Sequence, residues 1–434
     1  MPYDTLILTM GLQEKTLTAL GYVSRGIAPI PVKMKRMEGL ISIDDPYLYQ
    51  HLRVDETIIP MITNRKKPEK VIIYGRTLNA YNCIQGLMAR GVKAENIYFV
   101  IPDERCHVED FYGENDPDLD LDLPIINPNA FEDEYIEEKI HRMLEVMGIT
   151  IYKHCKIMKI VEDEKNHIIK SVVFKRLDIP AISPEEEEEE EEMMGRRSDS
   201  DMDGEGDEMG EGEDDYVSSK KRKRNELELN CRLMITCGHK DVDPDVFNAI
   251  HNNGLVYNGR LIVDKNFQTT DPSIFAAGSL TEFSGRYKSM AMSRSLRMDR
   301  YNGREMGSRL ARSVFDIYDP TISAAVNEQS SLQEDELPTF FLPQGNGGRI
   351  PGDLIYYYIK TTNPLVIREG DVQEKNRKDL MCDNIAEGKG QFIKFTFNKI
   401  GLIDSVTYMG TEDVVIQSLW SFVGLHENYL NRLT

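Results

Sequence analysis

The stretch that decides the fold is Val71-Ile72-Ile73-Tyr74-Gly75-Arg76-Thr77-Leu78-Asn79-Ala80, and an apolar-periodic run to Arg90 follows it. Four apolar residues, one glycine and the periodic run predict a buried strand, a tight turn and an amphipathic helix. The phosphate loop of a dinucleotide-binding fold has this order and requires the pattern G-x-G-x-x-G/A. Gly75 provides the turn of that pattern, and Ala80 permits close packing of the helix.

Thr77 occupies the place of the middle glycine. A glycine there lets the backbone approach the pyrophosphate, whereas a β-branched side chain obstructs the approach and resists a positive φ. The sequence therefore predicts that the fold persists while its binding of NAD(P) is damaged. Asp103 or Glu104, at the end of the next strand, could still hold a ribose hydroxyl.

The 434 residues are enough for about two or three domains, and their formal net charge is -21. Eighteen acidic residues and two arginines between Glu185 and Asp215 supply most of that charge. The rest of the chain is only mildly acidic, so nucleic acid is not an expected partner. Residues 180–225 predict a disordered acidic insertion. The basic run Lys220–Arg224 is interpreted as a local counter-charge, with a nuclear-import signal as the alternative.

Six cysteines are scattered without any C-x-x-C pair. In a chain of this size they indicate a reducing compartment, and neither a disulfide framework nor a metal site is expected. No apolar run approaches the ~20 residues of a membrane-spanning helix, and the first residues lack the pattern of a secretory signal. We therefore expect a cytoplasmic protein that does not contact membranes.

Periodicity, together with glycine and proline breaks, predicts the secondary structure along the chain. From Thr321 the sequence changes character and predicts a separate α+β unit. The expected strands are 6–8, 71–74, 97–101, 149–160, 167–177, 227–237, 261–264, 274–278, 392–397 and 401–408, with 149–160 and 167–177 forming a hairpin. The expected helices are about 78–90, 132–147, 287–318 and 413–425.

Four segments resemble successive pieces of the flavoprotein reductases that contain two dinucleotide-binding domains. They are Tyr3–Gly11, Lys70–Arg90, Met234–Gly238 and Leu261–Gly278. The resemblance implies an α/β fold of degenerate FAD/NAD(P)-reductase-like Rossmann domains, with the acidic insertion and a C-terminal α+β interface-like domain. It implies a remnant of the flavin-type domain (1–65), a degenerate nucleotide-binding-like domain (66–270), a return to the first domain (271–320) and a dimerisation or docking unit (321–434).

The cofactor contacts that this resemblance implies are altered. Thr9-Met10 replaces the Ala-Thr that precedes Gly11, and Thr77 replaces the middle glycine. After Gly278, the family has an aspartate that binds the ribityl chain of the flavin, and this chain has Ser279. We therefore expect a pseudo-oxidoreductase with no catalytic residue and no cofactor. The alternative is an FAD- or NAD(P)-dependent oxidoreductase whose first half lies outside this chain.

The acidic insertion, the C-terminal unit and the segment Ile274–Tyr287 together resemble a family of cilia- and flagella-associated proteins. This resemblance implies a component of the calmodulin- and spoke-associated complex at the base of the radial spoke. The implied location is the axoneme of motile cilia and of the sperm flagellum. It also implies that the chain is a fragment or a short isoform. The expected function is therefore that of a non-catalytic scaffold.

The segment expected as a long basic helix carries the candidate partner-binding residues. Its interleaved apolar and basic positions could lie in a groove of calmodulin. We favour the alternative that the apolar positions belong to the core and that the arginine-rich outer face binds an acidic partner. The candidates are Arg294, Arg297, Arg300, Arg304, Arg309 and Arg312.

Overall fold

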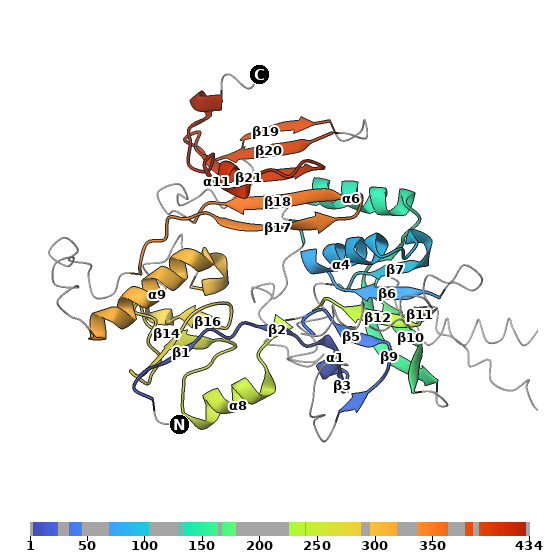
Figure 1. Ribbon diagram of the computed structural model, residues 1–434, viewed down its shortest axis with the longest axis horizontal. Helices are drawn as coiled ribbons and strands as arrows, with labels where there is room; N and C mark the ends of the chain where they lie inside the picture. Colours follow the sequence, from blue (N-terminus) through green and yellow to red (C-terminus); the bar gives the residue numbers. More distant parts are fainter. Residues whose placement is uncertain are drawn as a thin grey trace, which may run out of the picture.

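The computed structural model contains three structural layers (Figure 1): a five-stranded parallel sheet with a three-stranded sheet on one face, a layer of short paired strands, and a five-stranded antiparallel sheet. The predicted acidic insertion, Glu104 and Arg294 lie outside the described residues, apart from Asn225 at the end of the insertion. The described residues are 3–24, 34–45, 69–103, 130–131, 133–163, 167–178, 225–238, 240–287, 296–318, 337–362, 378–384 and 390–430.

A five-stranded parallel sheet forms the layer that contains the phosphate loop. Its strands run in the order β5 (Leu40–Ser42), β12 (Leu233–Thr236), β6 (Val71–Tyr74), β7 (Ile97–Val100) and β8 (Thr150–Tyr152). The crossover helices α4 (Leu78–Ala89) and α6 (Glu134–Val146) bury their apolar residues on one face of this sheet. Strands of four fully buried residues, such as β6, are typical of a sheet that is covered on both faces.

The other face of this sheet is covered by a three-stranded antiparallel sheet of β9 (Cys155–Asp163), β10 (Ile168–Arg176) and β11 (Glu226–Asn230). The expected strand 149–160 is therefore wrong as a single element, because β8 joins the parallel sheet while β9 pairs with β10. His154, with a φ of 55°, is where the chain turns between the two. The expected strand 227–237 likewise divides into β11 and β12.

A second layer holds the first residues of the chain beside residues from its middle. In it, β1 (Leu6–Leu8) pairs in parallel with β15 (Ile274–Ala276), and β14 (Leu261–Val263) pairs with β16 (Thr281–Phe283). Its core contains several phenylalanines and is bordered by α8 (Pro244–Asn252). Short strands β2 (Gln13–Glu14) and β13 (Lys240–Asp241), and β3 (Tyr22–Val23) and β4 (Lys35–Arg36), also form pairs, and α1 (Thr16–Ala19) lies between β2 and β3 in the chain.

The expected single helix over 287–318 is wrong. Its described part contains a short 3-10 turn, η3 (Met298–Arg300), and the helix α9 (Gly303–Tyr318). Asn302 separates the two, because its side-chain oxygen accepts hydrogen bonds from the backbone N–H groups of Arg304 and Glu305. An asparagine in this role begins a helix.

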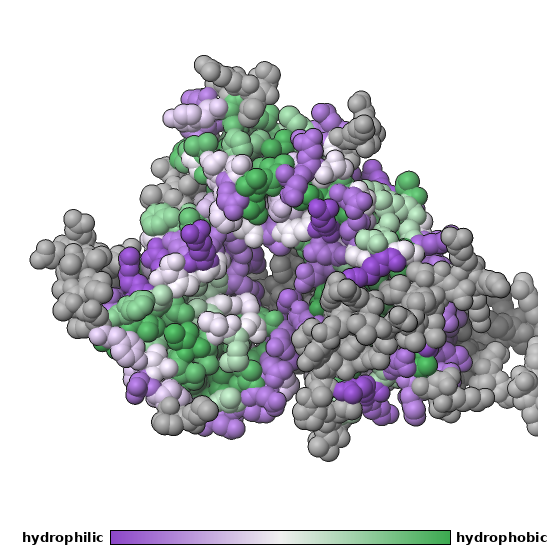
Figure 2. Space-filling model, in the orientation of Figure 1, coloured by the Kyte–Doolittle hydropathy of each residue, from purple (hydrophilic) through white to green (hydrophobic). Residues whose placement is uncertain are grey.

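A five-stranded antiparallel sheet forms the third layer. Its strands run in the order β17 (Gln344–Ile350), β18 (Leu354–Lys360), β21 (Ile403–Gly410), β20 (Phe392–Phe397) and β19 (Lys378–Asp383). One face packs on α4 and α6 and the other on α11 (Ile416–Trp420) and η6 (Glu427–Leu430). In Figure 2, hydrophobic residues reach the surface over this sheet and over the layer that contains β14 and β16.

The expected helix 413–425 ends early, after the five residues of α11. The following segment turns back onto β21, where Ile403 donates to the carbonyl of Leu425 and Gly424 donates to that of Ile403. These bonds compete with further helical ones. Among the described residues, no helix combines the length and the apolar character needed to span a membrane.

Candidate functional site

Gly75 is required by the close approach of a neighbouring strand end. A Cβ atom built at this position would lie 2.4 Å from the carbonyl oxygen of Cys237, which follows β12. Its N–H group donates to the carbonyl of Val100 at 3.1 Å. The glycine of the phosphate loop therefore serves the packing of three strand ends, whether or not a phosphate lies over it.

Thr77 is bonded within the chain. Its hydroxyl donates to the carbonyl of Cys237 at 2.9 Å. Its φ of -81° is an ordinary value, so the backbone here has no need of a glycine. Ala80 is buried against the sheet as expected, and its N–H donates to the carbonyl of Thr77.

Ser279 is also bonded within the chain. Its hydroxyl accepts the backbone N–H of Leu12 at 3.0 Å, and its carbonyl accepts the guanidinium of Arg260. A Cβ at Gly11 would lie 3.2 Å from the Ser279 hydroxyl oxygen. Gly278, with a φ of 105°, makes the turn that brings these groups together.

These contacts test whether the residues fit a dinucleotide coenzyme. The two side chains that replace the expected contacts, Thr77 and Ser279, direct their polar atoms at backbone atoms of this chain. The chain has neither the middle glycine nor the carboxylate that the family pattern supplies, and one hydrogen bond of each replacing hydroxyl is made within the chain. Neither side chain is therefore placed to reproduce the contact that the family's glycine or aspartate makes with a coenzyme.

A buried carboxylate lies near the ends of two strands of the parallel sheet. Glu14 is 5% exposed, and its side chain accepts the hydroxyls of Ser42 at 2.9 Å and of Thr236 at 2.8 Å. Its other oxygen accepts the N–H of Thr16 at 3.0 Å. This network joins residues 222 positions apart, and a single polar residue in a short strand gives no sequence signal for it.

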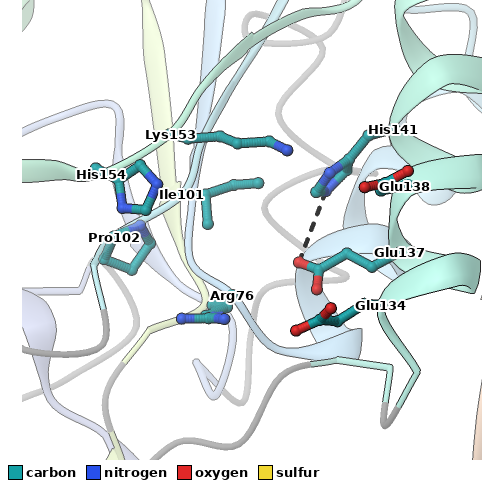
Figure 3. Close-up of a pocket in the computed structure, with 9 residues that line it drawn as sticks. All are labelled: Arg76, Ile101, Pro102, Glu134, Glu137, Glu138, His141, Lys153 and His154. Carbon is teal, nitrogen blue, oxygen red and sulfur yellow. Dashed lines mark ion pairs between the residues drawn. The ribbon is translucent and has the colours of Figure 1, made fainter. Parts of the chain in front are cut away.

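A pocket of about 240 Å³ lies beside the phosphate loop (Figure 3). It opens at the carboxyl ends of β6, β7 and β8, where ligands bind in open α/β sheets, and α6 forms its far wall. Basic and acidic side chains face one another across it. The lining residues are Arg76, Ile101, Pro102, Glu134, Glu137, Glu138, His141, Lys153 and His154.

His141 is the buried polar residue of this pocket. Its Nε2 atom is 2.9 Å from the Tyr81 hydroxyl and 4.0 Å from a carboxylate oxygen of Glu137. Burial, together with the positive charges of Lys153 and Arg76, lowers the pKa of His141 to about 4. The imidazole is therefore neutral near pH 7. Burial also raises the pKa of Tyr81 well above its ordinary value.

Asp103, one of the two residues that could hold a ribose hydroxyl, accepts a hydrogen bond within the chain. Its carboxylate is 2.8 Å from Nδ1 of His154, beside the same pocket. The two residues are 51 positions apart and come from the ends of neighbouring strands. A hydrogen bond within the chain therefore already engages the His154 ring that lines this pocket.

Two buried cysteines, Cys231 and Cys237, are held in their protonated form. Burial raises the pKa of Cys237, and a hydrogen bond to Cys83 raises it further. Burial alone raises the pKa of Cys231 to about 12. Thiols of this kind are poor nucleophiles. Among the described residues, no three His, Cys, Asp or Glu side chains lie together as metal ligands would.

The described candidate arginines divide into two sets. Arg297 pairs with Asp299 at 2.6 Å, and Arg309 pairs with Glu305 at 3.0 Å. The remaining three are exposed on η3 and α9, so they are the ones available to an acidic surface: Arg300, Arg304 and Arg312.

The comparison with known proteins shows where the chain belongs. Residues 338–434 match the family model described as the CFAP61 dimerisation domain. The whole chain is 36% identical, over 481 aligned positions, to cilia- and flagella-associated protein 61 of Tetrahymena thermophila. The chain is a relative of cilia- and flagella-associated protein 61. The expected resemblance is thereby confirmed, and the chain spans 28% of the length of that relative.

Solved structures confirm the α/β reductase-like fold that the sequence predicts. One is the covalent putidaredoxin reductase–putidaredoxin complex, for which the alignment covers 99% of this chain and 72% of the matched chain, with 10% identity and a TM-score of 0.52. The alignment with an NAD-dependent persulfide reductase from A. fulgidus covers 100% of this chain and 59% of the reductase, with 11% identity and a TM-score of 0.52. The alignment with a water-forming NADH oxidase from Lactobacillus brevis covers 99% of this chain and 70% of the oxidase, with 10% identity and a TM-score of 0.50. At these identities the likeness concerns the fold alone.

Proposed function

We propose that this chain is a non-catalytic structural block of cilia and flagella, built on a reductase-like fold. The observation that carries the proposal is the pair of hydrogen bonds that hold Thr77 and Ser279 to the chain's own backbone. A fold can persist after its chemistry is lost, because the strands and helices are stabilised by packing and not by the coenzyme. The whole-length similarity to a cilia- and flagella-associated protein supports the location.

Within that function, we assign the chain to the axoneme, at the base of the radial spokes, as part of the calmodulin- and spoke-associated complex. The C-terminal unit mediates self-association, which the match of residues 338–434 to a dimerisation domain supports. The exposed arginines Arg300, Arg304 and Arg312 form a docking face for an acidic partner.

Calmodulin binding through α9 is a weaker proposal on this geometry. Met306 and Leu310, the apolar residues that calmodulin would need, are buried in the core of the second layer. The Glu305 carboxylate accepts the backbone N–H groups of Phe341 and Leu342. Removing α9 from these contacts would expose that core to water, so binding by the folded chain is not expected.

The absorbance spectrum and the thermal stability of the purified chain test the loss of coenzyme binding. We expect no flavin band near ~450 nm and no increase in Tm when FAD, NADH or NADPH is added in excess, because a ligand that binds the folded state raises Tm. A yellow protein with flavin bound in equal amount, or a clear rise in Tm with any of the three, would overturn the non-catalytic assignment.

Proximity labelling from this chain in a ciliated cell tests its place in the axoneme. Enrichment of radial-spoke and spoke-associated proteins over a cytoplasmic control is expected. Enrichment of soluble redox enzymes, with no axonemal protein among the labelled set, would contradict it.

A further inference from the structure

We propose that two copies of this chain associate by pairing strand β19 with its symmetry mate, so that two five-stranded sheets become one. The inference rests on the self-association proposed above and names the surface that performs it. In the C-terminal sheet, β19 lies at one end of the strand order and has β20 as its partner strand among the described residues. Figure 1 shows it at the outer limit of the molecule.

The opposite edge of the sheet is engaged within the chain. Strand β17 packs against α4, where a Cβ at Gly348 would lie 2.5 Å from the side-chain oxygen of Asn82. The Gln344 amide at its start donates to the carbonyl of Asp299. The outer strand β19 is therefore the edge of this sheet that is placed to meet another chain.

The middle of β19 lacks the devices that protect edge strands. Soluble proteins protect such edges with central lysines, prolines or bulges. The central residues are Leu380, Met381 and Cys382, and the pairing of β19 with β20 is regular over all six residues. Met381 is 47% exposed. A regular strand whose centre is uncharged and exposes Met381 and Cys382 is suited to pairing with another strand, and its charged residues lie toward its two ends.

Two-fold symmetry and charge together select the register. Residues directly opposite each other in an antiparallel pair point to the same face of the sheet, whereas neighbours along a strand point to opposite faces. A two-fold axis perpendicular to the sheet therefore sets one residue opposite its own copy in the second chain. An axis at Met381 would set Asp379 opposite Asp383, and an axis at Asp379 would set it opposite itself. Like charges in direct opposition destabilise a sheet. Axes at Leu380 and at Cys382 avoid both, and the Leu380 axis is preferred because it pairs five residues of the strand, against three for the Cys382 axis.

The chosen register sets two further pairs on either side of the axis. Asp379 lies opposite Met381 of the second copy, and Lys378 lies opposite Cys382 of the second copy. Lys378 has a side chain that is 70% exposed, and Cys382 is also exposed, so both are accessible for pairing. The ion pairs of Lys378 with Glu427 and of Asp379 with Lys394 keep these side chains on opposite faces of the sheet.

Light scattering on the full chain, across a concentration series, tests the interface through a matched pair of variants. Met381→Glu sets a like charge opposite Asp379 twice by symmetry, so the dissociation constant should rise about tenfold. Met381→Lys sets an opposite charge there and should leave it unchanged or lower it. Thermal unfolding of each variant checks that the fold is retained.

Cross-linking tests the register. Lys378→Cys faces the native Cys382 of the second copy, so mild oxidation should give a disulfide-linked dimer on a non-reducing gel. Asp379→Cys, one residue further along on the other face, should not. A wild-type dimer that is unaffected by Met381→Glu and is not linked through Lys378→Cys overturns the β19 assignment and leaves self-association intact. A wild-type chain that stays monomeric at every concentration overturns both.

Discussion

At the residue scale, Thr77 and Ser279 occupy the positions where the reductase family has the middle glycine of the phosphate loop and the flavin-binding aspartate. Each hydroxyl forms one hydrogen bond with a backbone group distant in sequence, at 2.9 Å and 3.0 Å. A net contribution of roughly 1 kcal/mol for each bond is typical. Each bond therefore ties together two segments of one layer: Thr77 joins the start of α4 to the end of β12, and Ser279 joins the end of β15 to Leu12.

His141 makes the stability of the chain depend on pH. Its pKa is lowered from 6.5 to about 4 in the folded state, so the unfolded chain binds the proton more readily between these values. Stability is full above about pH 6.5 and falls as the pH drops toward 4. We expect a loss on the order of 2 kcal/mol by pH 5. Urea unfolding at pH 7.5 and pH 5 measures it.

His141→Gln is the control for this pH dependence, because it keeps a polar group beside the Tyr81 hydroxyl and removes the titration. The variant should lose less stability than the wild type between the two pH values. Equal losses in both proteins would show that another group governs the effect.

At the element scale, α4 connects two layers, because one face packs on the parallel sheet and β17 lies against the helix. The glycines of β17 permit this arrangement by their small size. A Cβ at Gly347 would lie 2.6 Å from the backbone oxygen of Tyr356 on β18. The strand therefore needs a glycine at position 347, because β18 leaves no room there for a side chain.

Two glycine substitutions separate this spatial need from helix propensity. Gly347→Ala should destabilise the chain by about 1–3 kcal/mol, since backbone must move to admit the methyl group. Gly86→Ala, in α4 with nothing within 4 Å of the added atom, should stabilise it by about 1 kcal/mol. Urea unfolding midpoints of both variants test this, and a stabilised Gly347→Ala would refute the packing argument.

At the scale of the whole molecule, the C-terminal sheet and the parallel sheet share one core through α4 and α6. Tyr356 of β18 meets Phe131 edge to face at 4.9 Å between ring centroids. Ion pairs join the same layers, with Lys394 2.6 Å from Asp133 and Lys139 bonded to Asp383. Layers joined in this way are expected to unfold together.

Tyr356→Ala tests that coupling, and the truncation should cost about 3–5 kcal/mol. Trp420, the single tryptophan, lies in the C-terminal unit and reports on it by fluorescence, whereas far-ultraviolet circular dichroism is weighted to helices such as α4 and α6. In the wild type, the two signals should change at one urea concentration. In the variant, they should again change together, at a lower urea concentration. Two separated transitions would contradict a shared core.

The sequence by itself determined the elements whose pattern is local. The apolar run and the glycine after it defined β6 and α4, and alternating residues defined β20 with bounds that match the structure. The replaced residues Thr77 and Ser279 were also visible as departures from a motif. The aromatic run of β18 was a strand signal that the sequence analysis missed.

Only the tertiary structure decided which groups meet. Three contacts have no local sequence pattern, because each joins residues from separate elements. They are the buried network of Glu14, the contact of Cys83 with Cys237, and the pairing of Asp103 with His154. The division of 149–160 between two sheets also depends on distant contacts, because β8 pairs with β7 while β9 pairs with β10. Side-chain periodicity records which face is buried, whereas contacts over long sequence separations depend on how the layers pack.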